Sequence, residues 1–146
     1  MSVQSAVKPS LTLKRRLKAP PAKGFAAWTD PEKMTRWMGP GEVKCISAES
    51  DPRAGGRYSY QMRTPGGESH DVGGVYREVI ANEKLVFTWA WKTAPEQESL
   101  VTVLFKPDGD GTLLTVTHEQ FADEGSRDRH QGGWNGALDK LEKLFA

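Results

Sequence analysis

Alternation of apolar and polar residues dominates the chain from residue 11 to about residue 121 and predicts a series of β-strands. In the first segment, 11–18, Leu11, Leu13 and Leu17 share one parity, and the other parity is mostly basic. Arg15 is the one charged residue on the apolar face. We interpret the basic run 14–18 as the solvated face of a strand, which also discourages aggregation at a sheet edge, rather than as a nucleic-acid patch.

Two short helices are predicted next. Pro20 and Pro21 end the first strand, and Phe25 and Trp28 recur at the spacing of three that one helix face requires. Residues 29–32 offer a Thr or Asp cap and a Pro at the first position of a second helix. The apolar face of this second helix is formed by Met34, Trp37 and Met38, before a stop at Gly39-Pro40-Gly41. We expect both helices to pack against one mouth of whatever the sheet encloses.

Five or six further strands follow, each bounded by turn residues. Their segments are 43–49, 57–63, 68–80, 84–92, 100–106 and a last strand from the loop 108–111 to about residue 121. The segment 84–92 has the strongest pattern, because its large residues from Leu85 to Trp91 share one parity. Gly73 and Gly74 indicate a bulge or a close backbone approach, and the inward parity beyond them is left undecided.

The period becomes helical near Ser126 and stays so to the end of the chain. An apolar stripe is formed by Trp134, Leu138, Leu141 and Phe145. The predicted helix has about 20 residues, which corresponds to a length of order 30 Å. The glycines of its first half, each costing about 1 kcal/mol relative to Ala, are Gly132, Gly133 and Gly136. Close approach to the sheet, or a bend that leaves room beside His130 and Trp134, would compensate for them.

Together these elements predict an α+β fold in which a curved antiparallel sheet of six to seven strands wraps around the long C-terminal helix. A curled sheet diverges from a straight helix, so a wedge opens between them that side chains either fill as core or line as a pocket. Large apolar side chains with polar atoms are typical of a ligand pocket. The candidate lining residues are Trp37, Tyr58, Tyr60, Met62, Trp89, Trp91, Phe105, His118, His130 and Trp134.

The composition indicates the class of protein and its expected location in the cell. The chain has 146 residues, with 37% hydrophobic and 27% charged residues and a net charge of +1. These values predict a single soluble domain over residues 1–146, with residues 1–9 as a flexible lead-in, and neither a nucleic-acid partner nor membrane insertion. Cys45 is the only cysteine, so no internal disulfide forms and a cytoplasmic location is expected.

The residues that could carry chemistry are few. His70, His118 and His130 are the only histidines, and their spacing does not place two metal ligands on one strand or helix face, so no metal site is expected. Nucleophile and cofactor motifs are absent, so no cofactor is expected, and we lean against an enzyme. The catalytic alternative is His118 as a general base facing Tyr58 or Tyr60, with Glu119 or His130 nearby.

Five segments, in this order and spacing, resemble a known family. They are FAAWTDPE at 25–32, GGRY at 55–58, LVFTW at 85–89, LTVTH at 114–118 and GWNGALDKL at 133–141. The chain resembles the heat-shock protein 90 ATPase activator homologue family over nearly its whole length. The resemblance implies the helix-grip fold of the wider SRPBCC superfamily, which includes START and birch-pollen-allergen-like proteins.

Three functions remain open at this point. The superfamily implies binding of a small hydrophobic molecule in the cavity between sheet and helix, which is the function we favour. It also includes cyclase or dehydratase chemistry, which here would use a pocket histidine, as would a hydrolytic enzyme. The family name implies a co-chaperone that regulates a heat-shock protein 90 ATPase in the stress response. A homodimer through the sheet edge or the short helices is left open.

Overall fold

A seven-stranded antiparallel sheet forms the frame of the protein. The structure is a computed structural model, and it describes residues 8–146. The strands are β1 (Leu11–Leu17), β2 (Lys44–Ser50), β3 (Arg57–Arg63), β4 (Ser69–Ile80), β5 (Lys84–Trp91), β6 (Ser99–Asp108) and β7 (Gly111–Glu119). The helices are α1 (Pro21–Thr29), α2 (Pro31–Met34) and α3 (Glu124–Leu144). The predicted element order and α+β fold are confirmed.

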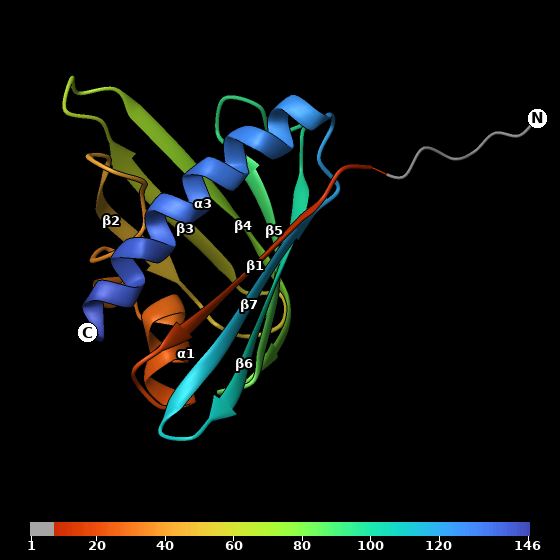
Figure 1. Cartoon of the computed structure of the whole chain (residues 1–146). Helices are drawn as coiled ribbons and strands as arrows, with labels where there is room; N and C mark the ends of the chain where they lie inside the picture. Colours follow the sequence, from red (N-terminus) through yellow and green to blue (C-terminus); the bar gives the residue numbers. More distant parts are fainter. Residues whose placement is uncertain (1–7) are drawn as a thin grey trace, which may run out of the picture.

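The strand order across the sheet is β1-β7-β6-β5-β4-β3-β2. Strands β2 to β7 are each paired with the next, and β1 pairs with β7, so β1 and β2 form the two edges. The connection from β1 to β2 must therefore cross from one edge to the other, and it contains α1 and α2. Figure 1 shows α3 running diagonally across the sheet, with its C-terminal end near β2 and α1. The sheet curls around this helix as a half-barrel.

The core lies between the inward face of the sheet and α3. In β5 the predicted parity is confirmed, because Leu85, Phe87 and Trp89 are buried. On α3 the residues that face the sheet and are buried are Trp134, Ala137, Leu138 and Leu141. Such burial of large apolar side chains contributes about 1.5–3 kcal/mol each and fixes which face of α3 meets the sheet. His118, one of the candidate pocket residues, points into the interior and has no exposed surface.

Arg15, the charged residue on the apolar face of β1, reaches across to α3. Its guanidinium lies 2.7 Å from Asp139 and 3.1 Å from Glu142, and it donates to the Asn135 amide oxygen at 2.8 Å. Only 18% of the Arg15 side chain is exposed. The exception in the sequence pattern is thus an attachment of the helix to an edge strand.

Gly74 marks the close backbone approach that the sequence predicts. A Cβ atom added there would lie 2.1 Å from the carbonyl oxygen of Thr88 on β5. The pairing of β4 with β5 shifts by one residue between Tyr76 and Glu78, as in a β-bulge. Tyr76 is buried, which establishes the inward parity beyond Gly74.

One expectation from the sequence is wrong, and another falls mostly outside the described residues. The second helix ends at Met34, although the apolar pattern extended it through Trp37 and Met38. Trp37 instead follows the helix, and its indole N–H donates to the carbonyl oxygen of Ala27 at 2.8 Å, so a tertiary contact places it. Residues 1–7 of the predicted lead-in 1–9 lie outside the described residues. Within residues 8–146 no helix has the length and apolarity that crossing a membrane requires.

Candidate ligand-binding site

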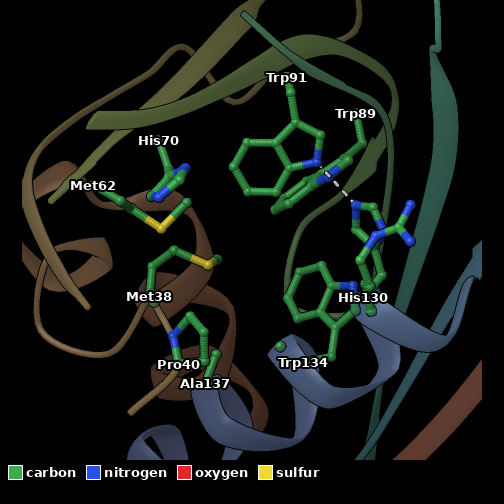
Figure 2. A pocket seen from close by; sticks show the side chains of 12 residues that line it. Met38, Pro40, Met62, His70, Trp89, Trp91, His130, Trp134 and Ala137 are labelled. Atoms are coloured by element: carbon green, nitrogen blue, oxygen red, sulfur yellow. Dashed lines mark hydrogen bonds between the residues drawn. The ribbon is translucent and has the colours of Figure 1, made fainter. Parts of the chain in front are cut away.

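A cavity of about 430 Å³ lies between β5 and the N-terminal half of α3. Its volume is within the range of sites that hold small organic molecules. The lining residues are Met38, Gly39, Pro40, Met62, His70, Trp89, Trp91, Arg129, His130, Gly133, Trp134 and Ala137. Arg129 and His70 are exposed, so the cavity opens to solvent on their side. Figure 2 shows the labelled side chains around this space.

Three indoles form one wall of the cavity. Trp89 and Trp91 come from alternate positions of β5 and therefore point to the same face of the sheet, and Trp134 comes from α3. The ring centroids of Trp89 and Trp134 are 5.1 Å apart, and those of Trp89 and Trp91 are 5.7 Å apart. Met38 and Met62 lie across the cavity from these rings (Figure 2). The walls are therefore aromatic on one side and thioether on the other, both suited to flat apolar molecules.

Small residues on α3 leave this space open. A Cβ atom added at Gly133 would come no closer than 4.0 Å to a neighbour, the ring of Pro40. A Cβ atom added at Gly136 would lie 2.8 Å from the Cβ of Pro40. Gly136 thus allows α3 to approach the loop before β2 closely, whereas the sequence analysis expected a close approach to the sheet. Gly133 instead leaves space for the cavity.

A chain of hydrogen bonds runs behind the indole wall. The Trp134 Nε1–H donates to His118 Nδ1 at 2.9 Å, and His118 Nε2 lies 2.7 Å from Ser99 Oγ. Ser99 in turn donates to the carbonyl oxygen of Trp89 at 3.2 Å. Because Nδ1 accepts from Trp134, the proton of the neutral imidazole is on Nε2 and is donated to Ser99. Both ring nitrogens of His118 are engaged.

These contacts make His118 a neutral, structural histidine. Burial, and secondarily the nearby His130, lowers the pKa of His118 from 6.5 to about 2. Tyr58, the predicted partner of His118, donates its hydroxyl to the carbonyl oxygen of Thr88 instead. The aromatic rings that pack against His118 come from Trp89, Phe121, His130 and Trp134. No free lone pair remains on the imidazole to accept a proton, so the geometry does not favour the hypothesis of a His118 general base.

His130 holds the edge of the indole wall at the cavity itself. The Trp91 Nε1–H donates to His130 Nε2 at 2.9 Å, and His130 Nδ1 donates to the carbonyl oxygen of Ser126 at 2.7 Å. Burial, and to a lesser extent the positive charge of Arg129, lowers the pKa of His130, while its bond to Ser126 acts in the opposite direction. His130 is therefore the neutral tautomer that accepts from Trp91.

Trp89 carries an unmatched donor. Its indole Nε1 is buried and has no hydrogen-bond partner among the described residues, as is also true of Trp28. A buried donor without a partner costs about 1–3 kcal/mol. Figure 2 shows the Trp89 indole behind that of Trp91, beside the hydrogen bond from Trp91 to His130. An acceptor that reached this corner would remove that cost.

Half of the predicted lining residues surround the cavity. Those that do are Met62, Trp89, Trp91, His130 and Trp134. The others are buried and do not line it: Trp37, Tyr58, Tyr60, Phe105 and His118. Phe105 packs against Phe25 of α1, and Tyr58 packs against Phe87 with centroids 5.0 Å apart, so the wedge is filled at those positions.

Several lining residues were missed by the sequence analysis. They are Met38, Gly39, Pro40, His70, Arg129, Gly133 and Ala137. Gly133 lies beside Trp134 in a glycine-rich half-helix, and this was the available signal of a gap. Arg129 and His70 gave no signal, because exposed polar residues at a rim look like any other surface residues.

Within residues 8–146 no group of three or more His, Cys, Asp or Glu side chains is placed to hold a metal ion. The buried Cys45 thiol donates to the carbonyl oxygen of Ser47 at 3.2 Å. Burial raises the pKa of Cys45 to about 11, so it stays a thiol at neutral pH.

The sequence matches the model of the activator of Hsp90 ATPase homolog 1-like protein family over residues 18–146. The chain belongs to this family. Among solved structures of similar fold, a protein from Chromobacterium violaceum is 27% identical, with a TM-score of 0.85, covering 93% of this chain and 96% of that one. The AHSA1 protein of Silicibacter pomeroyi is 26% identical, with a TM-score of 0.83 and the same two coverages, 93% and 96%.

A third similar structure, of an uncharacterized protein from Rhizobium leguminosarum, is 31% identical with a TM-score of 0.75. It covers 99% of this chain and 97% of that chain. No curated protein matches the sequence. The family assignment confirms the resemblance inferred from the five sequence segments and places the chain in the SRPBCC helix-grip superfamily.

Proposed function

We propose that this protein binds a small, largely apolar molecule in the cavity between β5 and α3. The observation that carries the proposal is the cavity itself, which has a volume of about 430 Å³ and is walled by three tryptophans and two methionines. Because the cavity opens to solvent beside Arg129 and His70, a small molecule can enter it. An apolar molecule that did so would remove its own surface and that of these five side chains from water, which favours binding.

The test uses N-phenyl-1-naphthylamine, a neutral dye whose fluorescence rises in apolar surroundings. It should bind the wild-type protein at one site and raise its melting temperature. At a dye concentration about 100 times the dissociation constant, the expected stabilisation is about 2.7 kcal/mol, or about 5–10 °C for a chain of this size.

Two neighbouring glycines of α3 offer a matched pair of variants. Gly133→Leu places a large side chain into the cavity, whereas Gly132→Leu makes the same change where an added Cβ meets nothing within 4 Å. Both remove a glycine from a helix interior and should not weaken α3. We expect dye affinity to fall at least about tenfold in Gly133→Leu and to be unchanged in Gly132→Leu. Equal binding by both variants would show that the dye lies elsewhere and would contradict the proposal.

The chaperone alternative has only the family name in its favour. A docking surface for another protein would be expected to show a contiguous exposed apolar patch. The large apolar side chains that are exposed in the described residues are Ile46, Ile80, Leu104 and Leu144. They come from β2, β4, β6 and α3 respectively, and this distribution does not favour a protein partner over the cavity.

A further inference from the structure

We propose that the ligand is an organic acid, a flat apolar ring system that carries one anionic oxygen group and binds with that group at the corner formed by Trp89, His130 and Arg129. This inference deepens the proposed function and rests on it. It names the chemical class of the occupant, which the volume and the apolar walls alone do not.

The polar side chains around the cavity are hydrogen-bond donors or positively charged, and this favours an anionic ligand. The polar residues that line the cavity are Arg129, His70 and His130, together with the indoles of Trp89 and Trp91. In the described part of the chain no acidic side chain lines the cavity. A site that presents donors and one fixed positive charge, without a carboxylate, is complementary to an acceptor or an anion.

The indole donor of Trp89 is unmatched among the described residues. Trp89 is only 4% exposed, and its Nε1–H has no partner among the residues described. Its neighbours at the corner are occupied, because Trp91 donates to His130 and His130 donates to Ser126. The Trp89 donor is therefore the one left for an oxygen atom of the ligand, while Trp91 and His130 keep their partners.

Arg129 carries a positive charge that is not used in an ion pair within residues 8–146. It forms no ion pair with any residue of the described chain, although α3 carries acidic residues on either side of it. Asp128 pairs with Arg127 at 2.7 Å, and Asp123 accepts from the backbone N–H of Ser126 at 2.7 Å as the helix cap. Asp128 is thus paired with Arg127, and the Arg129 guanidinium has no ion pair among the described residues.

The experiment uses two competitors of nearly equal shape, 2-naphthoate and 2-naphthamide, which differ in charge. Each displaces bound N-phenyl-1-naphthylamine from the wild-type protein, and we expect naphthoate to bind at least about fivefold more tightly than naphthamide. Arg129→Gln should remove most of this preference. Lys143→Gln takes the same charge from the same helix, at its far end, and should retain it.

A second variant tests the corner without changing the net charge. Trp89→Phe keeps an aromatic ring but removes the indole donor, so it should weaken naphthoate more than naphthamide. Three results would overturn the organic-acid proposal while dye binding stands. They are equal competition by the two ligands, failure of both to compete, and a preference for naphthoate that survives both Arg129→Gln and Trp89→Phe. Failure of the dye itself to bind wild-type protein would instead overturn the proposed function.

Discussion

Acid should destabilise this protein through His118, and the effect can be calculated from the structure. The pKa of His118 is about 2 in the folded chain, against an ordinary value of 6.5 that applies once the chain unfolds. Between these values the unfolded state binds the additional proton, so the free energy of unfolding falls as the pH falls. The slope approaches about 1.4 kcal/mol per pH unit, and the loss between about pH 8 and pH 5.5 is about 1.4 kcal/mol.

His118→Gln removes the titrating group and can keep its contacts. The glutamine carbonyl can accept from Trp134 Nε1–H, and its NH₂ can donate to Ser99 Oγ, as the imidazole does. The variant should be less stable than the wild type at about pH 8, because the amide fits the space less well. The difference should shrink by about 1.4 kcal/mol by pH 5.5, since only the wild type then loses the contribution of His118.

Urea unfolding followed by tryptophan fluorescence, at several pH values from about 8 to 5.5, measures this difference. His130, whose pKa is also lowered, weakens both proteins in the same direction and cancels in the comparison. His70→Gln, at an exposed histidine, controls for the loss of a histidine as such. Parallel pH profiles for wild type and His118→Gln would refute the reasoning, because they would mean that His118 takes up its proton without disturbing the fold.

Three further changes test the packing of α3. Gly132→Ala should raise the free energy of unfolding by about 1 kcal/mol, because an added Cβ there meets nothing within 4 Å; an unchanged urea midpoint would contradict this. Gly136→Ala should lower it by about 1–3 kcal/mol, since the new Cβ would lie 2.8 Å from that of Pro40. Arg15→Met should lower it by about 1 kcal/mol through loss of the pair with Asp139 and its neighbours on α3, and high salt should reduce this difference.

Most of the fold could be predicted because it depends on local periodicity. The parity of Leu85, Phe87 and Trp89 determines a strand face wherever that strand lies in the sheet, and the stripe of α3 determines a helix face in the same way. The end of α2 could not be predicted on this basis. Trp37 continues the helical spacing, but its indole bonds to the Ala27 carbonyl oxygen of α1, and this tertiary contact follows a turn rather than a helix.

The site was harder to predict, because parity says which side chains point inward but not how far along the wedge they lie. Tyr58 and Trp89 both point to the helix side of the sheet, yet Tyr58 packs against Phe87 and Tyr76 while Trp89 faces open space. The difference depends on the distance between sheet and helix at each point. Such distances depend on contacts between remote segments, as between Pro40 and Gly136, which are almost a hundred residues apart in the sequence.

The polar contacts behind the indoles explain why the cavity stays open. Trp134 is held by its hydrogen bond to His118, and Trp91 by its bond to His130, each at 2.9 Å. A side chain fixed in this way cannot rotate into the adjacent space without leaving a buried donor and acceptor unpaired, which costs more than the cavity would gain by closing. Under the proposed function, a ligand would meet walls that are already in place and would lose little affinity to ordering them. His118 thus holds Trp134 in the wall of a cavity that it does not itself line, and under the proposed function it would act as a positioning residue.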